Sequence, residues 1–327
     1  MPDLNRLFDI LKGKRVFIQG HNFPDADAIA SSFGIQTLLK LHGIPSTIIY
    51  VGQIEQFNTA LMIETLELDL VNLNNIKDMT SDDYVIIVDA QKNNANIFDS
   101  PGDEVACIDH HPTFKDANYR YSDIRPDTGA CSSIVAKYFL ESKTKMDTKT
   151  ATTLLYGIKM DTKELSRGVS ELDIDMFHYL YKKADLALIN RLQTKTMELK
   201  DLKSFGTAIQ NIQVFGNLAI AKIDGSFPDG IIAATSDFIL SAEEIDIMVV
   251  YSRRPDGIKL SVRSCLPEYN AGEATAIALY NLGEGGGHAE MAGGFIKNDK
   301  INDQIDWMIK YRFLGAFGKL KEFQAQI

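Results

Sequence analysis

Acidic and histidine side chains gather in one short stretch near the amino terminus, HNFPDADAIAS (21–31). Its proline cannot continue a strand and favours extended backbone at Phe23, so we expect His21 at the end of a strand. Asp25 and Asp27 then fall in the turn into the next helix, where both carboxylates can converge. Two acids beside a strand end are costly unless a cation neutralises them, although either aspartate alone could simply cap the helix.

The same pattern occurs twice more along the chain. The apolar run 84–88 ends in Asp89, and the run 105–108 ends in Asp109, His110 and His111. Parallel α/β sheets build their sites at the carboxyl ends of the strands, so three such endings favour one shared site over three separate helix caps. Histidine and aspartate without cysteine suit Mn²⁺, Mg²⁺, Fe²⁺ or Zn²⁺, and the oxygen-rich balance favours Mn²⁺ or Mg²⁺. Several carboxylates indicate two metals, because one bridging aspartate can hold a pair ~3.5–4 Å apart.

The elements that must position these residues alternate between strand and helix. Runs typical of strands occupy 14–20, 46–51, 84–89 and 105–109, and segments of helical period occupy 28–42 and 148–160. This alternation predicts an α/β fold in which a parallel sheet forms an amino-terminal catalytic domain.

A smaller α+β domain is expected after a helical connector. Strands are predicted at 218–224, 245–252 and 258–264, and helices at about 229–240 and 272–282. The resulting division is a catalytic domain at 1–188, a helical linker at 189–211 and a second domain at 212–327.

Composition narrows the class of protein. The 327 residues carry a net charge of −10, which argues against binding along long nucleic acid, since that requires a broad basic face. Three widely spaced cysteines suggest neither a disulfide framework nor a thiolate zinc site. No signal peptide and no membrane span are visible in the sequence. We therefore expect a soluble, cytoplasmic protein with no membrane partner.

Taken in order, these motifs resemble those of the DHH phosphoesterases. The resemblance runs from H-x-x-P-D-x-D-A-x-x-S (21–31) through Asp89, the name-giving 109–111 motif and GIKMDT (157–162). In the second half, SVRS (261–264) and GGGHAEMAGG (285–294) are similar to the DHH-associated domain. Within the family, the nano-RNase and pAp-phosphatase branch is the most similar. Ala26 and Ala30 replace glycines that are usual there, which leaves substrate preference open.

The resemblance implies a role for each motif residue. One metal would be held by His21, Asp25 and Asp89. The second would be held by Asp27, Asp89, His110 and Asp161. His111 would contact the phosphoryl group or protonate the leaving oxygen, while Asp109 would orient a histidine.

Substrate would be gripped by residues of the second domain, in a cleft between the domains. These residues are Arg263, Ser264, Gly285, Gly286, Gly287 and His288. On the residues alone, an exposed strand arginine and a flexible glycine-rich loop would be the simpler interpretation.

The function expected is hydrolysis of short oligoribonucleotides or of linear dinucleotides such as pApA, with pAp as an additional candidate, by a two-metal, Mn²⁺-dependent centre. Pyrophosphatase or exopolyphosphatase activity uses the same kind of cluster and is one alternative. A nucleotide-binding regulator without activity is another. A homodimer is conceivable from the resemblance.

Overall fold

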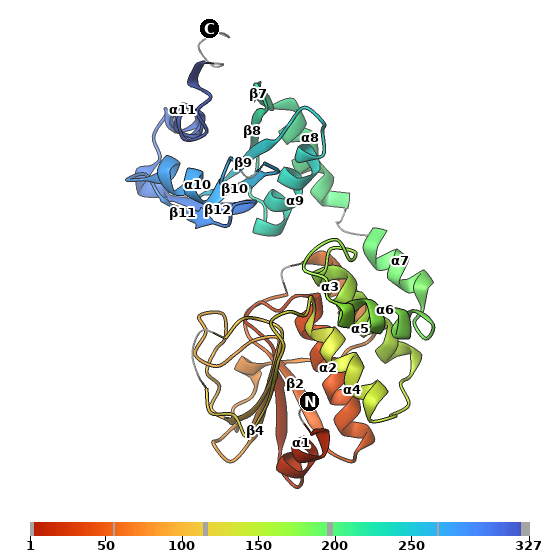
Figure 1. Ribbon diagram of the computed structural model, residues 1–327. Helices are drawn as coiled ribbons and strands as arrows, with labels where there is room; N and C mark the ends of the chain where they lie inside the picture. Colours follow the sequence, from red (N-terminus) through yellow and green to blue (C-terminus); the bar gives the residue numbers. More distant parts are fainter. Residues whose placement is uncertain (1–2, 55, 114–116, 195–198, 267, 322–327) are drawn as a thin grey trace. The chain divides into compact units, whose positions relative to one another are not determined.

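Figure 1 shows the computed structural model, which describes residues 3–54, 56–113, 117–194, 199–266 and 268–321. The chain divides into two compact units, Met1–Thr196 and Met197–Ile327. One six-stranded sheet is built from strands before residue 125 and the other from strands after residue 212. The α/β prediction is confirmed, with a parallel sheet in the first unit and a second sheet with helices in the other. Within the predicted linker, α7 ends at Thr194 and α8 begins at Leu202.

The first unit is built on a parallel sheet in the order β3-β2-β1-β4-β5-β6. Its strands are β1 (Val16–Gln19), β2 (Ser46–Tyr50), β3 (Val71–Asn72), β4 (Tyr84–Val88), β5 (Asp103–Asp109) and β6 (Tyr121–Ile124). Its helices are α1 (Leu4–Leu11), α2 (Ala26–Leu41), α3 (Phe57–Thr65), η1 (Leu73–Asn75), α4 (Cys131–Glu141), α5 (Thr148–Asp161), α6 (Glu171–Tyr181) and α7 (Leu186–Thr194). Strands β1, β4 and β5 lie inside the sheet and are almost fully buried, which explains their continuous apolar runs.

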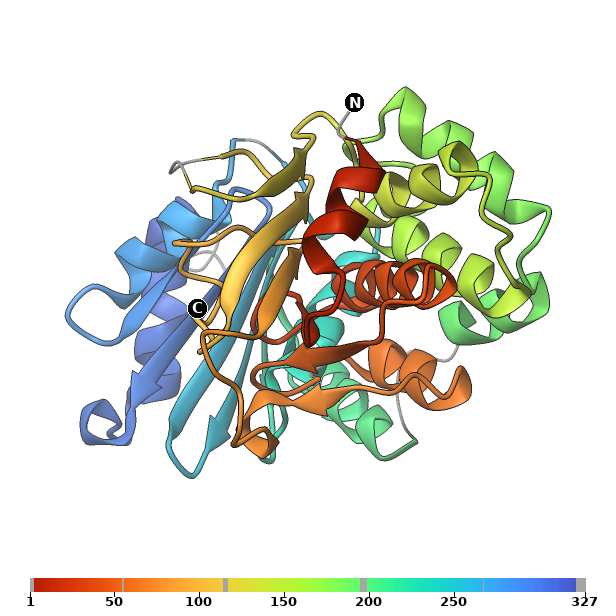
Figure 2. The same cartoon turned by 90° about the horizontal axis from the view of Figure 1, so that it is seen from below.

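Helices cover one face of this sheet (Figure 2). The main core packs them against Ile18, Ile86 and Ile108, whereas Phe17 and Val85 point to the other face and pack with residues of the segment after β3. This arrangement leaves the carboxyl ends of β1, β4 and β5 side by side at one edge.

Helix α2 starts earlier than the sequence suggested. Asp25 is its N-cap, and its Oδ1 accepts hydrogen bonds from the backbone N–H groups of Asp27 and Ala28. The prediction that Asp27 lies in the turn is therefore wrong, because this residue belongs to the first turn of the helix. Asp25 does cap the helix, as the simpler interpretation held, and its carboxylate also lies beside His21.

The extended backbone predicted for Phe23 is also wrong. Its φ is +54°, in the left-handed region that side chains other than glycine rarely adopt. The cause is tertiary: Phe23 N–H donates to the Val51 carbonyl at 2.9 Å, and its ring lies directly on Gly52. These contacts override the local preference of a residue before proline.

The second unit has a mixed sheet in the order β11-β12-β10-β9-β8-β7. Its strands are β7 (Gln213–Phe215), β8 (Leu218–Ile223), β9 (Ile247–Arg254), β10 (Gly257–Ser264), β11 (Glu284–Gly287) and β12 (Met291–Lys297). Its helices are η2 (Leu199–Asp201), α8 (Leu202–Gln210), α9 (Asp229–Leu240), α10 (Ala271–Leu279), η3 (Asn298–Lys300) and α11 (Ile305–Ala316). The glycine run predicted as a loop is instead the edge strand β11, because pairing with β12 fixes it.

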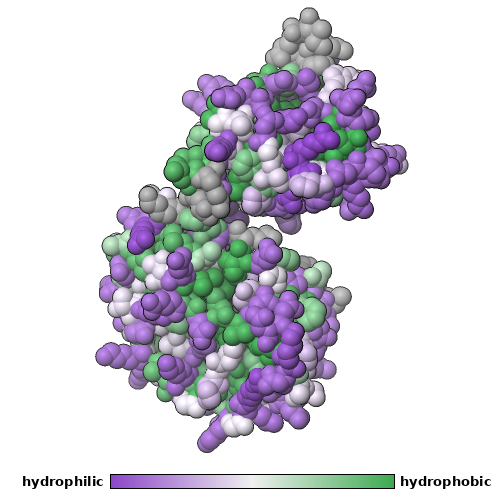
Figure 3. All heavy atoms as spheres, turned by 180° about the vertical axis from the view of Figure 1, so that it is seen from behind, coloured by the Kyte–Doolittle hydropathy of each residue, from purple (hydrophilic) through white to green (hydrophobic). Residues whose placement is uncertain are grey.

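Hydrophilic side chains cover most of the face seen in Figure 3, with a broader hydrophobic area on the first unit. Among the described helices, none combines the length and the apolar character needed to cross a bilayer.

Candidate metal centre

Six predicted ligands come together at the carboxyl edge of the first sheet. They follow β1, β4 and β5, cap α2 or lie in its first turn, or lie in the last turn of α5. Potential ligand atoms lie within 4.8 Å of one another in three groups. The groups are His21 with Asp25 and Asp89, Asp27 with His110 and Asp161, and Asp89 with His110 and His111. Asp89 and His110 each belong to two groups, so the groups form one continuous cluster.

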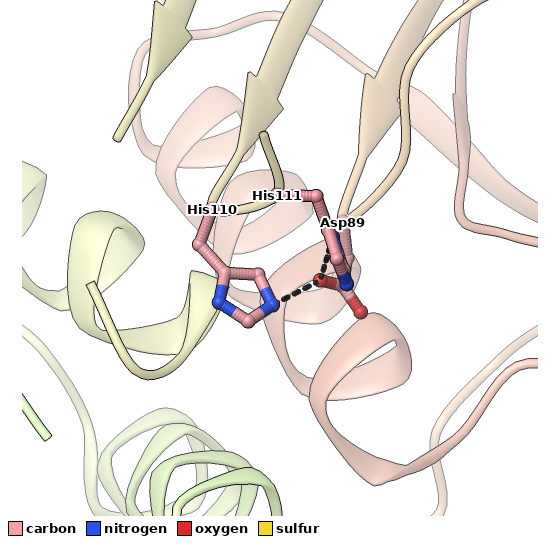
Figure 4. A group of neighbouring side chains, drawn as sticks. All are labelled: Asp89, His110 and His111. Carbon is pink, nitrogen blue, oxygen red and sulfur yellow. Dashed lines mark ion pairs between the residues drawn. The ribbon is translucent and has the colours of Figure 1, made fainter. Parts of the chain in front are cut away.

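Asp89 is the centre of this cluster. Its Oδ1 lies 3.2 Å from His110 Nε2 and 3.8 Å from His111 Nδ1 (Figure 4), and its Oδ2 lies 3.8 Å from His21 Nε2. On the far side, His110 Nε2 is also 3.2 Å from Asp161 Oδ2. A carboxylate with histidines on both oxygens is in the position that a bridging ligand requires.

Two of the three histidines of the cluster are oriented by backbone carbonyls. His21 Nδ1 lies 2.9 Å from the Asn22 carbonyl, and His110 Nδ1 lies 3.0 Å from the Thr128 carbonyl. A carbonyl can only accept, so each Nδ1 carries a proton and each ring turns Nε2 toward the carboxylates. Once Nε2 gives up its own proton, the ring is in the tautomer that coordinates a metal through Nε2.

The environment of Asp89 is unfavourable without a cation. Its side chain is 3% exposed, its φ is +58°, and its buried Oδ1 has no hydrogen bond when His110 Nε2, 3.2 Å away, is unprotonated. An unpaired buried carboxylate oxygen and a strained backbone together are characteristic of a functional position. A divalent cation on Oδ1 would satisfy this oxygen, so the residues present fit a bound metal.

Asp27 is held by the amino terminus of α4. Its Oδ2 accepts the backbone N–H of Cys131 at 2.7 Å, and its Oδ1 accepts that of Ser132 at 3.0 Å. A Cβ at Gly157 would lie 2.3 Å from Ser132 Oγ and 2.9 Å from Asp27 Oδ1, so only glycine lets α5 approach this closely. Gly157, the glycine of the GIKMDT motif, is therefore required for the close packing of α5 against Asp27.

The pKa values show that the metal-free cluster retains protons. Burial, followed by the neighbouring Asp89 carboxylate, raises the pKa of Asp27 well above its usual range. Burial lowers the pKa of His21 and His110, but the hydrogen bonds and charges of the aspartates outweigh it and raise these values to about 9 and about 10. Burial also raises the pKa of Asp161 to about 6. Protons therefore balance the crowded carboxylates in the metal-free protein.

His111 is arranged differently from the other two histidines. Its Nδ1 lies 2.9 Å from Oδ1 of the fully buried Asp109, and its side chain is 46% exposed. The hydrogen bond to Asp109, opposed by burial, raises the pKa of His111. Gln91 Nε2 donates to Asp109 Oδ2 at 2.7 Å and to the His111 carbonyl at 2.9 Å. Asp109 and Gln91 thus orient His111, whose Nε2 remains available to a substrate.

Several contributors were not identified from the sequence. Gln91, the Asn22 and Thr128 carbonyls and the amino terminus of α4 act through tertiary contacts. Asp173 also supports the site, because its carboxylate accepts from Gly129 N–H at 2.7 Å and from Ser133 Oγ at 2.5 Å beside the start of α4. Among these contributors, only Gln91 could have been found from the sequence, because it lies two residues after Asp89 at the end of a predicted strand.

The predicted substrate residues lie within the second unit and come together at one end of its sheet. Arg263 on β10 is paired in register with Met291 on β12, and the His288 N–H donates to the Met291 carbonyl at 2.8 Å. Ser264 follows Arg263, and its N–H donates to the Glu290 carbonyl. Arg263 Nε is also bound to Asp237 Oδ1 at 2.6 Å, a contact that the sequence did not indicate.

Close packing within the second unit explains two of the three glycines that were predicted to bind substrate. A Cβ at Gly285 would lie 2.7 Å from side-chain atoms of Leu279 and Thr275, and one at Gly287, with φ +154°, would lie 2.5 Å from the Met291 carbonyl oxygen. A Cβ at Gly286 would meet no atom within 4 Å. Gly286 is therefore the member of this run that packing leaves unexplained.

The fold and the cluster define an α/β protein with a candidate metal centre at the carboxyl edge of a parallel sheet. The profile of the DHH family N-terminal domain matches residues 15–158, and that of the DHHA1 domain matches residues 215–311. The chain belongs to the DHH family and carries a DHHA1 domain.

Relatives and a solved structure agree with this assignment. The chain is 30% identical over 280 residues to an uncharacterized protein of Methanocaldococcus jannaschii, covering 85% of this chain and 57% of that one. It is 25% identical over 315 residues to the cyclic-di-AMP phosphodiesterase PdeA of Listeria monocytogenes, covering 89% and 46%. It is 28% identical over 151 residues to a probable manganese-dependent inorganic pyrophosphatase of Streptococcus thermophilus, covering 45% and 48%.

The chain thus spans about half the length of the curated relatives that it matches. The crystal structure of an exopolyphosphatase-related protein from Bacteroides fragilis has a similar fold, with a TM-score of 0.76 at 18% identity, covering 97% of this chain and 96% of that one.

Proposed function

We propose that this chain is a metal-dependent phosphoesterase that hydrolyses short oligoribonucleotides and linear dinucleotides of the pApA type, with pAp as a further substrate. The observation that carries the proposal is Asp89, a buried carboxylate with a histidine Nε2 near each of its two oxygens. Such an arrangement is suited to two cations that share one ligand.

The metals proposed are two Mn²⁺ ions, with Mg²⁺ as an alternative. The first would be held by His21, Asp25 and Asp89, and the second by Asp27, Asp89, His110 and Asp161. The donor set supports this choice because oxygen ligands outnumber imidazoles and no described cysteine shares the cluster. When bound, the pair would supply an activated water and neutralise charge on the phosphoryl oxygens.

The chain's own residues would complete the reaction. His111, oriented by Asp109 and Gln91, presents Nε2 on the exposed side of the cluster and is the proposed proton donor or hydrogen-bond donor to the phosphoryl group. Asp109 would act by positioning, since both of its oxygens are already occupied by His111, Gln91 and the His110 N–H.

The second unit would hold the part of the substrate away from the metals. Arg263, Ser264, Gly285, Gly286, Gly287 and His288 are proposed for this role. Arg263 Nε and Nη1 already donate to Asp237, Ser261 and the Val262 carbonyl, so Nη2 is the nitrogen proposed to meet a phosphate. The open Gly286 allows close approach of a substrate. The net charge of −10 supports short substrates over long nucleic acid. The similarity to a cyclic-di-AMP phosphodiesterase adds cyclic dinucleotides to the substrates worth testing.

The test is product release by purified, Mn²⁺-saturated protein. The substrates are pApA, a five-nucleotide RNA, pAp, cyclic di-AMP and pyrophosphate, and Asp89→Ala is the negative control. Cleavage of pApA or short RNA that disappears in the control supports the proposal. Binding of nucleotides without turnover of any substrate would replace it with the regulator hypothesis.

A second candidate is pyrophosphatase activity. The similarity over 151 residues to a probable manganese-dependent inorganic pyrophosphatase favours it. That similarity covers 45% of this chain, less than the 89% matched by the phosphodiesterase. Turnover of pyrophosphate alone in the same assay would establish this candidate. A cytoplasmic location and a homodimer stay predictions.

A further inference from the structure

An unusual aromatic residue lies inside the metal-binding loop. Phe23 is two residues from His21 and two from Asp25, yet its side chain is 53% exposed and its backbone is in the left-handed region. Burying an aromatic ring is favourable, so a ring held out by a strained backbone indicates a purpose other than core packing.

The position of the ring is fixed by its neighbours. The Phe23 N–H donates to the Val51 carbonyl, and a Cβ at Gly52 would lie 2.7 Å from two ring atoms. Gly52 itself has φ +86°. The ring is thus supported on one side by a residue without a side chain, while about half of the surface of Phe23 faces solvent.

A second exposed aromatic residue is anchored to the same loop. Phe98 is 50% exposed, its N–H donates to Asn22 Oδ1 at 3.0 Å, and its carbonyl accepts from Gln19 Nε2 at 2.7 Å. Among the described residues of the first unit, Phe23, Phe98 and Tyr181 are the large aromatic side chains with more than a third of their surface exposed. Two of the three are tied to the loop that carries His21.

We propose that the Phe23 ring stacks on a nucleobase of the substrate whose phosphate lies on the metal centre. Phe98, which is anchored to the same loop, would assist this stacking. Aromatic faces bind bases without reading their sequence, as enzymes of short nucleic acids require. The inference rests on the proposed function and adds to it a specificity for substrates that carry a base.

The test compares ligands with and without a base. Calorimetry on the Mn²⁺-saturated full chain gives the Kd for 5′-AMP and for ribose 5-phosphate in the wild type, Phe23→Ala, Phe23→Leu and Phe23→Tyr. Removing one stacking contact weakens binding of 5′-AMP by roughly 5- to 150-fold. Ribose 5-phosphate binding should be unchanged, Tyr should restore most of the affinity and Leu should not. Tyr181→Ala, which removes an exposed aromatic from α6, is the matched control and should behave as the wild type.

Three results would overturn the proposal: a wild type that prefers neither ligand, equal 5′-AMP affinity in Phe23→Ala, or equal losses for both ligands. The last result would mean that the substitution disturbs the metal loop. These outcomes are separable from failure of the proposed function, because binding is measured without turnover. If Phe23→Ala loses the preference for 5′-AMP over ribose 5-phosphate, the stacking proposal is supported even when the wild type hydrolyses none of the substrates tested.

Discussion

The proposed bridging role of Asp89 predicts a specific effect of Asp89→Asn on stability. Asparagine tolerates the left-handed backbone at this position, so the loop should keep its shape. Burial raises the pKa of the Asp89 carboxyl, so replacing it with a neutral amide should not destabilise the metal-free protein. The substitution therefore removes metal binding without removing the fold.

The magnitude follows from linkage between binding and folding. A metal present at a thousand times its Kd stabilises the native state by about 4 kcal/mol per site. For a unit of the size of Met1–Thr196, each kcal/mol raises Tm by about 2–4 °C. One Mn²⁺ should therefore raise the Tm of the wild type by about 8–16 °C, and that of Asp89→Asn by close to zero.

The assay is thermal unfolding with and without Mn²⁺, after treatment with a chelator. Asp82→Asn, a change of the same chemistry at an exposed position in the first unit, is the matched control and should keep the full rise. A full rise in Asp89→Asn would refute the assignment of Asp89 as the shared ligand.

Three further predictions concern other parts of the molecule. Gly157→Ala places a Cβ against Ser132 and Asp27, so it should cost about 1–3 kcal/mol in urea unfolding, and an unchanged midpoint would contradict the packing argument. The metal-free protein should lose stability between about pH 6.5 and pH 10. The folded pKa values of His21 and His110, about 9 and about 10, exceed the unfolded value, so their stabilisation is complete below pH 6.5 and is lost as the pH rises through them. Scanning calorimetry should show this fall in stability for the metal-free protein and no such fall for the protein with bound Mn²⁺. Gly286→Ala should fold normally but raise KM, whereas Gly287→Ala should unfold at lower temperature.

The sequence was most informative where the evidence is local. An apolar run followed at once by aspartate or histidine places a side chain at the end of a buried strand, and parallel strands put such ends at one edge. For this reason the sequence alone predicts that Asp89 and His110 lie in one site.

Predictions failed where long-range contacts decide the local conformation. Phe23 adopts positive φ because Val51 and Gly52 hold it, and nothing near Phe23 in the sequence indicates that contact. The run 285–287 forms a strand because β12 pairs with it, although three glycines in succession indicate a loop. Gln91 orients His111 through a contact that spans 20 residues, which a motif of adjacent residues cannot reveal.

The position of the ligands along the chain has a consequence for biosynthesis. All six lie between His21 and Asp161, and the strands of the first sheet all precede residue 125. Domains generally fold as units during synthesis, with the amino-terminal one first. The unit with the candidate metal centre is therefore complete in sequence before any residue of the second unit has been translated, and a nascent chain can acquire its ions while the second unit is still being made.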